Sequence, residues 1–130
     1  MGHVNNAVYF TYFEHARIGY TRALMDAAGS GAGSSPGLSD IRFILADATC
    51  RYRSPAHLGE RLVVGIHVPR VGRKSFAFDY RSAEERSGRL VAEGSSTQVW
   101  YDYAASRSLP VPDDVVALME KVQRAPIPRS

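Results

Sequence analysis

Apolar residues recur with a helical period over the first part of the chain. Between residues 6 and 28, at 100° per residue, one broad side of a helix would carry Phe10, Phe13, Ala16, Tyr20 and Leu24. The polar stripe opposite is narrow, so we expect a helix that other parts of the fold largely cover. We expect Asn5 or Asn6 to cap this helix and Gly29 to end it, because Asn and Gly favour these positions.

The pattern then changes from a helical period to a period of two. After a Gly- and Ser-rich loop at residues 29–37, strand-like patterns occupy four ranges, which are 41–53, 61–71, 74–82 and 90–101. The short connections at 69–73 and 84–88 are typical of antiparallel hairpins. Gly94, inside the last of these segments, predicts a β-bulge or a bend around the helix.

A second, shorter helix is predicted at residues 113–123, where one side is apolar and carries Val115, Val116, Leu118, Met119 and Val122. One long helix followed by an antiparallel meander predicts an α+β fold, in which the sheet curls around the central helix within a single domain of residues 1–130. Because such a sheet has edges that need protection, we expect the chain to form a homodimer or homotetramer.

Composition and charge narrow the class of protein. With 45% hydrophobic and 22% charged residues, and no apolar run near the ~20 residues of a membrane helix, the sequence is typical of a globular protein. Cys50 is the single cysteine, which excludes an intramolecular disulfide and a multi-cysteine zinc site and makes the cytoplasm the expected location. The net charge of +3 permits an anionic ligand, but the basic residues are scattered, so nucleic acid binding is not favoured.

The start of the long helix is where we expect the chemistry. Free backbone N–H groups at a helix N-terminus polarise a carbonyl or hold an anion, and here they are accompanied by His3, Asn5 and Asn6. The residues alone leave two interpretations open, because Asn5 and Asn6 also suit plain capping. Glu14 and Arg17 are three residues apart, which predicts an ion pair within the helix; the alternative is that Glu14 acts as a base.

The segment GHVNNAVY at residues 2–9, followed by YFE at 12–14, resembles the helix-start signature of hotdog-fold acyl-CoA thioesterases, in the branch of 4-hydroxybenzoyl-CoA thioesterase. Later segments also resemble this family and extend the resemblance over nearly the whole chain, at residues 52–60, 71–76, 91–94 and 99–100. The resemblance implies a hotdog fold. It also implies hydrolysis of acyl-CoA, or acyl carrier protein, thioesters to the free acid and thiol without a cofactor.

For the site, the resemblance implies catalytic roles for His3 and Asn6, with the oxyanion held by backbone N–H groups of residues 2–6. Glu14 is the further catalytic candidate, as a substitute base, because it is the carboxylate in the first turns of the helix. Substrate binding is expected of seven further residues, Gly2, Val4, Asn5, Tyr9, Phe13, Arg73 and Lys74. The last two belong to a basic turn that would meet the phosphates of coenzyme A or would simply be solvated.

Family members carry a strand that ends in an Asp just ahead of the helix start, and that Asp is commonly the catalytic carboxylate. Only Met1 precedes Gly2 here, so we expect the strand and its Asp to lie upstream, and the identity of the carboxylate stays open. The alternative is a non-catalytic hotdog module that binds acyl-CoA or acts as an oligomeric scaffold. We expect no metal site, because His57 and His67 have no ligand spacing with any Cys, Asp or Glu.

Overall fold

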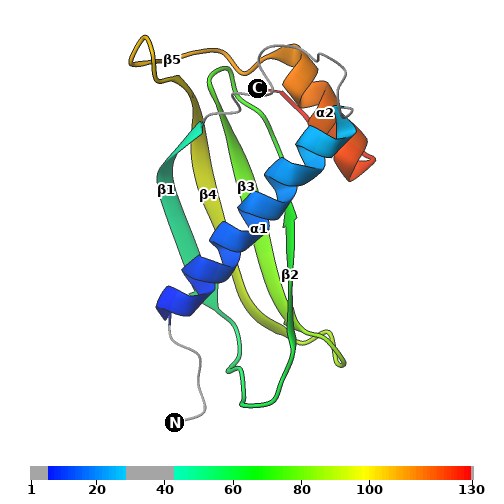
Figure 1. The fold of residues 1–130 in the computed structure, drawn as a ribbon. Helices are drawn as coiled ribbons and strands as arrows, with labels where there is room; N and C mark the ends of the chain where they lie inside the picture. The colour runs from blue at the N-terminus through cyan, green and yellow to red at the C-terminus, as the bar shows by residue number, and fades with distance from the viewer. Residues whose placement is uncertain (1–5, 29–42, 130) are drawn as a thin grey trace.

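The computed structural model describes residues 6–28 and 43–129. In chain order the elements are α1 Asn6–Ala27, β1 Phe43–Tyr52, β2 Leu62–His67, β3 Ser75–Glu84, β4 Leu90–Asp102, β5 Arg107–Ser108 and α2 Asp113–Gln123. The strands form one antiparallel sheet in the order β1-β4-β3-β2, with the short β5 paired to β4. Figure 1 shows α1 crossing one face of this sheet, so the predicted α+β fold is confirmed.

Most of the predicted elements are confirmed, with shifts at their ends. The long helix ends one residue earlier than predicted, the four strands lie within the predicted ranges or extend them by one or two residues, and α2 has the predicted bounds. The two-residue strand β5 was not predicted, because so short a segment has no periodic pattern. The predicted loop at 29–37 lies outside the described residues.

The helix α1 is held on the sheet by large aromatic and aliphatic side chains. Tyr9, Phe13, Tyr20 and Leu24 are all buried. The ring of Phe13 stacks on the ring of Tyr80 in β3, with centroids 4.5 Å apart and an interplanar angle of 12°. Offset aromatic pairs of this kind add to the hydrophobic stabilisation that their burial already provides. Phe13, Tyr20 and Leu24 of the predicted apolar side therefore lie in the core, whereas Phe10, which was predicted on the same side, is exposed.

The expectation that other structure largely covers α1 is wrong for the described part of the chain. Phe10 is 39% exposed, Ile18 45% and Met25 46%. The physical reason is that one sheet layer covers only one side of a helix. We refer to Phe10, Ile18 and Met25 as the outer α1 residues.

Gly94 permits close packing of α1 on the sheet and is not at a β-bulge. The pairing of β1 with β4 runs without a break through the partners Cys50 and Gly94, and the irregularities lie elsewhere, at Leu45/Asp47 and Ser82/Ala83. A Cβ at position 94 would lie 2.8 Å from Cε2 of Phe13 and still closer to the carbonyl oxygen of Thr49. Gly94 therefore gives the room in which Phe13 sits.

The two ends of the sheet differ. At one end α2 packs on the C-terminal half of α1, where the Tyr20 hydroxyl donates to Oε1 of Gln123 at 2.6 Å. The Gln123 side chain also accepts from the Val68 N–H at 2.7 Å and donates to the Val68 carbonyl at 3.2 Å. At the other end lie the start of α1 and the loop that joins β1 to β2 (Figure 1). Neither described helix has the length and apolar character needed to span a bilayer.

Candidate active site

The start of α1 is the first component of the candidate site. Asn6 is the first helical residue, as the sequence predicted, but its side chain lies outside what the structure describes. Gly2, His3, Val4 and Asn5 also lie outside the described residues, so their roles stay predictions. The first turns of any α-helix leave backbone N–H groups without intrahelical partners, and these groups are the donors that the site needs.

Tyr9 fixes the first turns of α1 to the sheet. Its ring makes edge contacts with the rings of Tyr12, at 5.9 Å between centroids, and Tyr52, at 5.2 Å. It also packs in a small apolar cluster that contains Ala56 and Ala92. Burial raises the pKa of the Tyr9 phenol, and the neighbouring phenol of Tyr52 raises this pKa further. Tyr9 therefore stays protonated at neutral pH and supports the wall of the site as a neutral group.

A groove runs beside residues 12–16 of α1, between the helix, the loop at residues 53–61 and β2, and has a volume of about 480 Å³. Its lining is apolar toward the sheet and polar toward solvent, and comprises Tyr12, His15, Ala16, Ala56, His57, Glu60, Leu62 and Val64. We call it the α1–β2 groove. A concave, largely apolar surface with a few polar groups is the usual form of a small-molecule site.

Glu60 is the carboxylate of this groove, and it is held firmly. Nη2 of Arg89 lies 2.8 Å from Oε1 and 3.0 Å from Oε2 of Glu60, and the His57 N–H donates to Oε1 at 2.7 Å. The hydrogen bond from Arg89, followed by that from His57, lowers the pKa of Glu60, so this carboxylate is ionised at neutral pH. Sequence reasoning did not single out Glu60 or Arg89, because the pairing joins residues that are 29 apart in the chain. The available signal was the three-residue spacing of His57 and Glu60, which is typical of a turn in which a carboxylate accepts from a nearby backbone N–H.

The predicted ion pair between Glu14 and Arg17 is wrong, since no salt bridge joins these two described residues. Nη1 of Arg17 instead donates to the Tyr80 hydroxyl at 2.9 Å, because the guanidinium reaches inward to a buried phenol. Glu14 lines a second groove, of about 250 Å³, on the β1 side of α1 with Arg17, Ile18 and Phe43. Eight residues separate Glu14 from Asn6, roughly 12 Å along the helix axis. The structure does not place Glu14 in the α1–β2 groove, and its catalytic role stays a prediction.

Phe13, Arg73 and Lys74 also lie apart from the groove. Phe13 is buried in the main core under α1. Arg73 and Lys74 are exposed in the turn before β3, where the Arg73 carbonyl accepts from the Val111 N–H at 2.8 Å. The opposite end of β3 faces the groove, and ten residues of strand span roughly 33 Å. Within one chain, therefore, the structure does not bring the basic turn to the start of α1.

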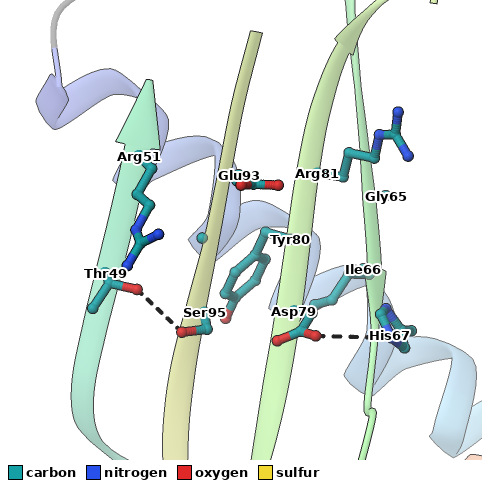
Figure 2. Close-up of a pocket in the computed structure, with 11 residues that line it drawn as sticks. Thr49, Arg51, Gly65, Ile66, His67, Asp79, Tyr80, Arg81, Glu93 and Ser95 are labelled. Carbon is teal, nitrogen blue, oxygen red and sulfur yellow. Dashed lines mark hydrogen bonds and ion pairs between the residues drawn. The ribbon is translucent and has the colours of Figure 1, made fainter. Parts of the chain in front are cut away.

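A wide trough of about 720 Å³ lies on the sheet face opposite α1. Figure 2 shows its side chains in cross-strand rows, with Thr49 bonded to Ser95 and His67 close to Asp79. Its cations alternate with carboxylates and its charged side chains are open to solvent, as on the solvated face of an ordinary antiparallel sheet. Among the described residues, no group of three or more His, Cys, Asp or Glu side chains is arranged to hold a metal ion. The α1–β2 groove is the candidate site.

The chain is similar in sequence and in fold to proteins of one family. The sequence profile of the thioesterase-like superfamily matches residues 1–119. A thioesterase from Thermus thermophilus, solved in complex with coenzyme A and Zn, is 28% identical, with 97% of this chain and 85% of that chain covered and a TM-score of 0.78. A 1,4-dihydroxy-2-naphthoyl-CoA thioesterase from Synechocystis is 20% identical, with 91% and 83% covered and a TM-score of 0.70, which shows a shared fold.

Proposed function

The chain belongs to the thioesterase-like superfamily, and we propose that it hydrolyses the thioester of an acyl-CoA, or of an acyl carrier protein, to a free acid and a thiol. Its fold is the hotdog fold. The observation that carries the proposal is the concave groove along residues 12–16 of α1, inside the region that matches the family. The coenzyme A bound by the Thermus relative supports a coenzyme A thioester as the substrate.

In the proposed mechanism, the thioester oxygen lies at the start of α1, where backbone N–H groups and the helix dipole stabilise the developing oxyanion. Water attacks the carbonyl carbon, and His3 and Asn6 orient the water and the carbonyl. A carboxylate accepts the proton of the water; Glu14 is the candidate within this sequence, and because it lies roughly 12 Å from Asn6 along α1, it would act through an intervening water or from another copy of the chain. Collapse of the tetrahedral intermediate breaks the C–S bond, and the thiolate leaves and takes up a proton. Gly2, Val4 and Asn5 contact the reacting group in this arrangement.

The α1–β2 groove holds the part of the substrate that adjoins the thioester. Tyr12, Leu62 and Val64 offer apolar contact area, and each buried CH₂ of a ligand contributes about 0.8 kcal/mol. Tyr9 supports this wall from beneath through its contacts with Tyr12 and Ala56. An acyl or pantetheine chain fits this surface better than a highly charged ligand does.

We further propose that the single domain of residues 1–130 assembles as a homodimer or homotetramer in the cytoplasm. In the described part of the chain β1 pairs with β4 alone, so its second edge is open, and Ile18 of the outer α1 residues lines a groove with Phe43 of β1. Leu45 and Tyr52 on β1 are also exposed. A second copy that pairs along β1 would cover the open edge and the apolar residues together. In such an assembly Arg73 and Lys74 of one copy could reach a ligand of another.

The test is a thiol-release assay with acyl-CoA substrates that range from short and long aliphatic to aromatic, on this chain and on a form extended by the in-frame codons upstream of Met1. We expect release of free coenzyme A from at least one substrate. His3→Ala and Asn6→Ala should each lower the rate, by roughly 10²–10³ if an oxyanion donor is lost. Absence of thiol release by both forms, each shown to be folded, would reject hydrolysis.

One observation favours the alternative of a binding module. Arg89 engages both oxygens of Glu60, so the carboxylate of the groove is not free to act as a base. A protein that binds a non-hydrolysable S-alkyl-coenzyme A tightly in calorimetry, but releases no thiol from any acyl-CoA, would support binding without turnover. Turnover of any acyl-CoA would exclude it.

A further inference from the structure

Arg89 follows the turn between β3 and β4 and ties this turn to the loop at residues 53–61. Its Nη2 contacts both oxygens of Glu60 and donates to the Pro55 carbonyl at 3.0 Å. Its Nε donates to Oγ of Ser54 at 3.1 Å, and that hydroxyl in turn donates to the Leu90 carbonyl at 2.8 Å. One guanidinium therefore fixes three points of the loop. We call this set of contacts the Arg89 clamp.

The loop that the clamp holds is a wall of the α1–β2 groove. Ala56, His57 and Glu60 all line the groove, and no regular secondary structure spans residues 53–61. Apart from the clamp, the start of the loop is tied to β4 by the Arg53 and Ser54 N–H groups, which both donate to the Val91 carbonyl, and by the ion pair of the Arg53 side chain with Glu93. At the other end of the loop, the Glu85 N–H donates to the Arg61 carbonyl at 2.8 Å. Between these two ends, Arg89 ties Ser54, Pro55 and Glu60 to the turn between β3 and β4.

The clamp also reaches the start of α1. Ala56 is buried and packs with Tyr9, the residue that fixes the first turns of the helix. A displacement of the loop would therefore alter both the groove wall and the support beneath the helix start. The clamp is charge-assisted, and hydrogen bonds of this type are about twice as strong as neutral ones.

We propose that Arg89 is a positioning residue for substrate binding, which keeps the wall of the α1–β2 groove in its binding conformation. The inference rests on the proposed function, because it takes this groove as the place where the substrate lies. Without Arg89, the loop samples many conformations, and only a fraction of molecules presents a complete wall. Apparent affinity falls in proportion to that fraction. Bond cleavage at the helix start is affected less, since Arg89 does not touch the reacting atoms.

The experiment compares Arg89→Met with Arg61→Met, a control that also removes one cation beside the same loop. Arg61 is 85% exposed and its nearest carboxylate, on Glu85, is 4.0 Å away. We expect Arg89→Met to raise the KM of the best acyl-CoA about tenfold, with kcat changed less than about threefold. Arg61→Met should leave both constants within about twofold of the wild type.

Two further variants separate positioning from general stability. Arg89→Lys keeps the charge but cannot reach Ser54, Pro55 and Glu60 at once, so its KM should lie between those of the wild type and Arg89→Met. Glu60→Gln should raise KM as well, and the double variant with Arg89→Met should be no worse than Arg89→Met alone, because both act through one contact. If Arg89→Met does not fold, the single variants Arg89→Lys and Glu60→Gln test the inference in its place.

Three results would overturn the inference: an unchanged KM in the Arg89 variants, an equal change in Arg61→Met, or a loss confined to kcat. Failure of the proposed function would be seen separately, as a wild type that releases no thiol. In that case the same variants are compared by their affinity for an S-alkyl-coenzyme A, and the expected tenfold ratio is unchanged.

Discussion

Replacing Gly94 by Ala tests the packing of α1 on the sheet most directly. The added Cβ would lie 2.8 Å from Cε2 and 3.4 Å from Cζ of Phe13, and within 3.0 Å of the carbonyl oxygen of Thr49. The ring can move only by disturbing its stack on Tyr80. The carbonyl belongs to the neighbouring strand β1, so relief there requires the two strands to separate. The substitution therefore combines a side-chain clash with a backbone clash.

The expected cost of Gly94→Ala is about 3 kcal/mol, the upper end of the 1–3 kcal/mol usual for overpacking, because one of the two obstacles is backbone. For a chain of this length, that cost lowers the midpoint of thermal unfolding by roughly 10 °C. The assay is thermal and urea unfolding followed by circular dichroism. Gly65→Ala is the matched control in β2, since its Cβ would meet nothing closer than the Arg81 carbonyl oxygen at 3.9 Å. We expect that control to be neutral or slightly stabilising.

A Gly94→Ala protein that unfolds within about 2 °C of the wild type would refute the packing argument. A second measurement separates the two clashes. Phe13→Leu removes the ring, so in the double variant with Gly94→Ala the combined loss should be smaller than the sum of the single losses. Strict additivity would mean that the Phe13 ring is not the obstacle.

Three other outcomes follow from the described contacts. Tyr80→Phe should lower the free energy of unfolding in urea by about 1–3 kcal/mol, because it leaves Arg17 without its phenol acceptor and breaks the contact with Ser96; an unchanged midpoint would contradict this. Phe10→Ser should leave the circular dichroism spectrum unchanged but lower the mass measured by light scattering if the outer α1 residues lie between copies; an unchanged mass would argue against that interface. Because the pKa of Glu60 is lowered in the folded state, its contribution to stability is present above the ordinary value of 4.5 and is lost as pH falls through the lowered pKa. In the Glu60→Gln variant, the free energy of unfolding in urea should therefore fall less steeply below pH 4.5 than in the wild type. An equally steep fall in the variant would refute the claim that the ionised Glu60 stabilises the fold through Arg89.

The sequence predicted the elements well, because their signals are local. The period of Phe13, Tyr20 and Leu24 and the alternation of Phe76, Phe78 and Tyr80 come directly from the geometry of a helix and a strand. A period does not say how many layers surround a helix. It therefore could not show that the outer α1 residues are exposed in the described chain.

The candidate site was predicted less completely, because its contacts are not local. Spacing alone favoured a bond from Glu14 to Arg17, whereas Arg17 reaches Tyr80, 63 residues away. The Arg89 clamp likewise depends on a strand order that brings residues 54–60 beside residue 89. Conversely, the turn with Arg73 and Lys74 looked suitable by composition but lies at the other end of β3.

The bond between Tyr20 and Gln123 joins residues 103 apart, and this separation bears on how the chain folds as it is made. Among the described elements α1 leaves the ribosome before the others, but β3 and β4, which cover its apolar side, follow 50 to 80 residues later, and α2 follows them. At about 5–20 residues per second, α1 waits several seconds with Phe13 and Leu24 uncovered. Chains interrupted before residue 113 lack the helix that closes this end of the sheet, so premature termination yields products that aggregate or are degraded.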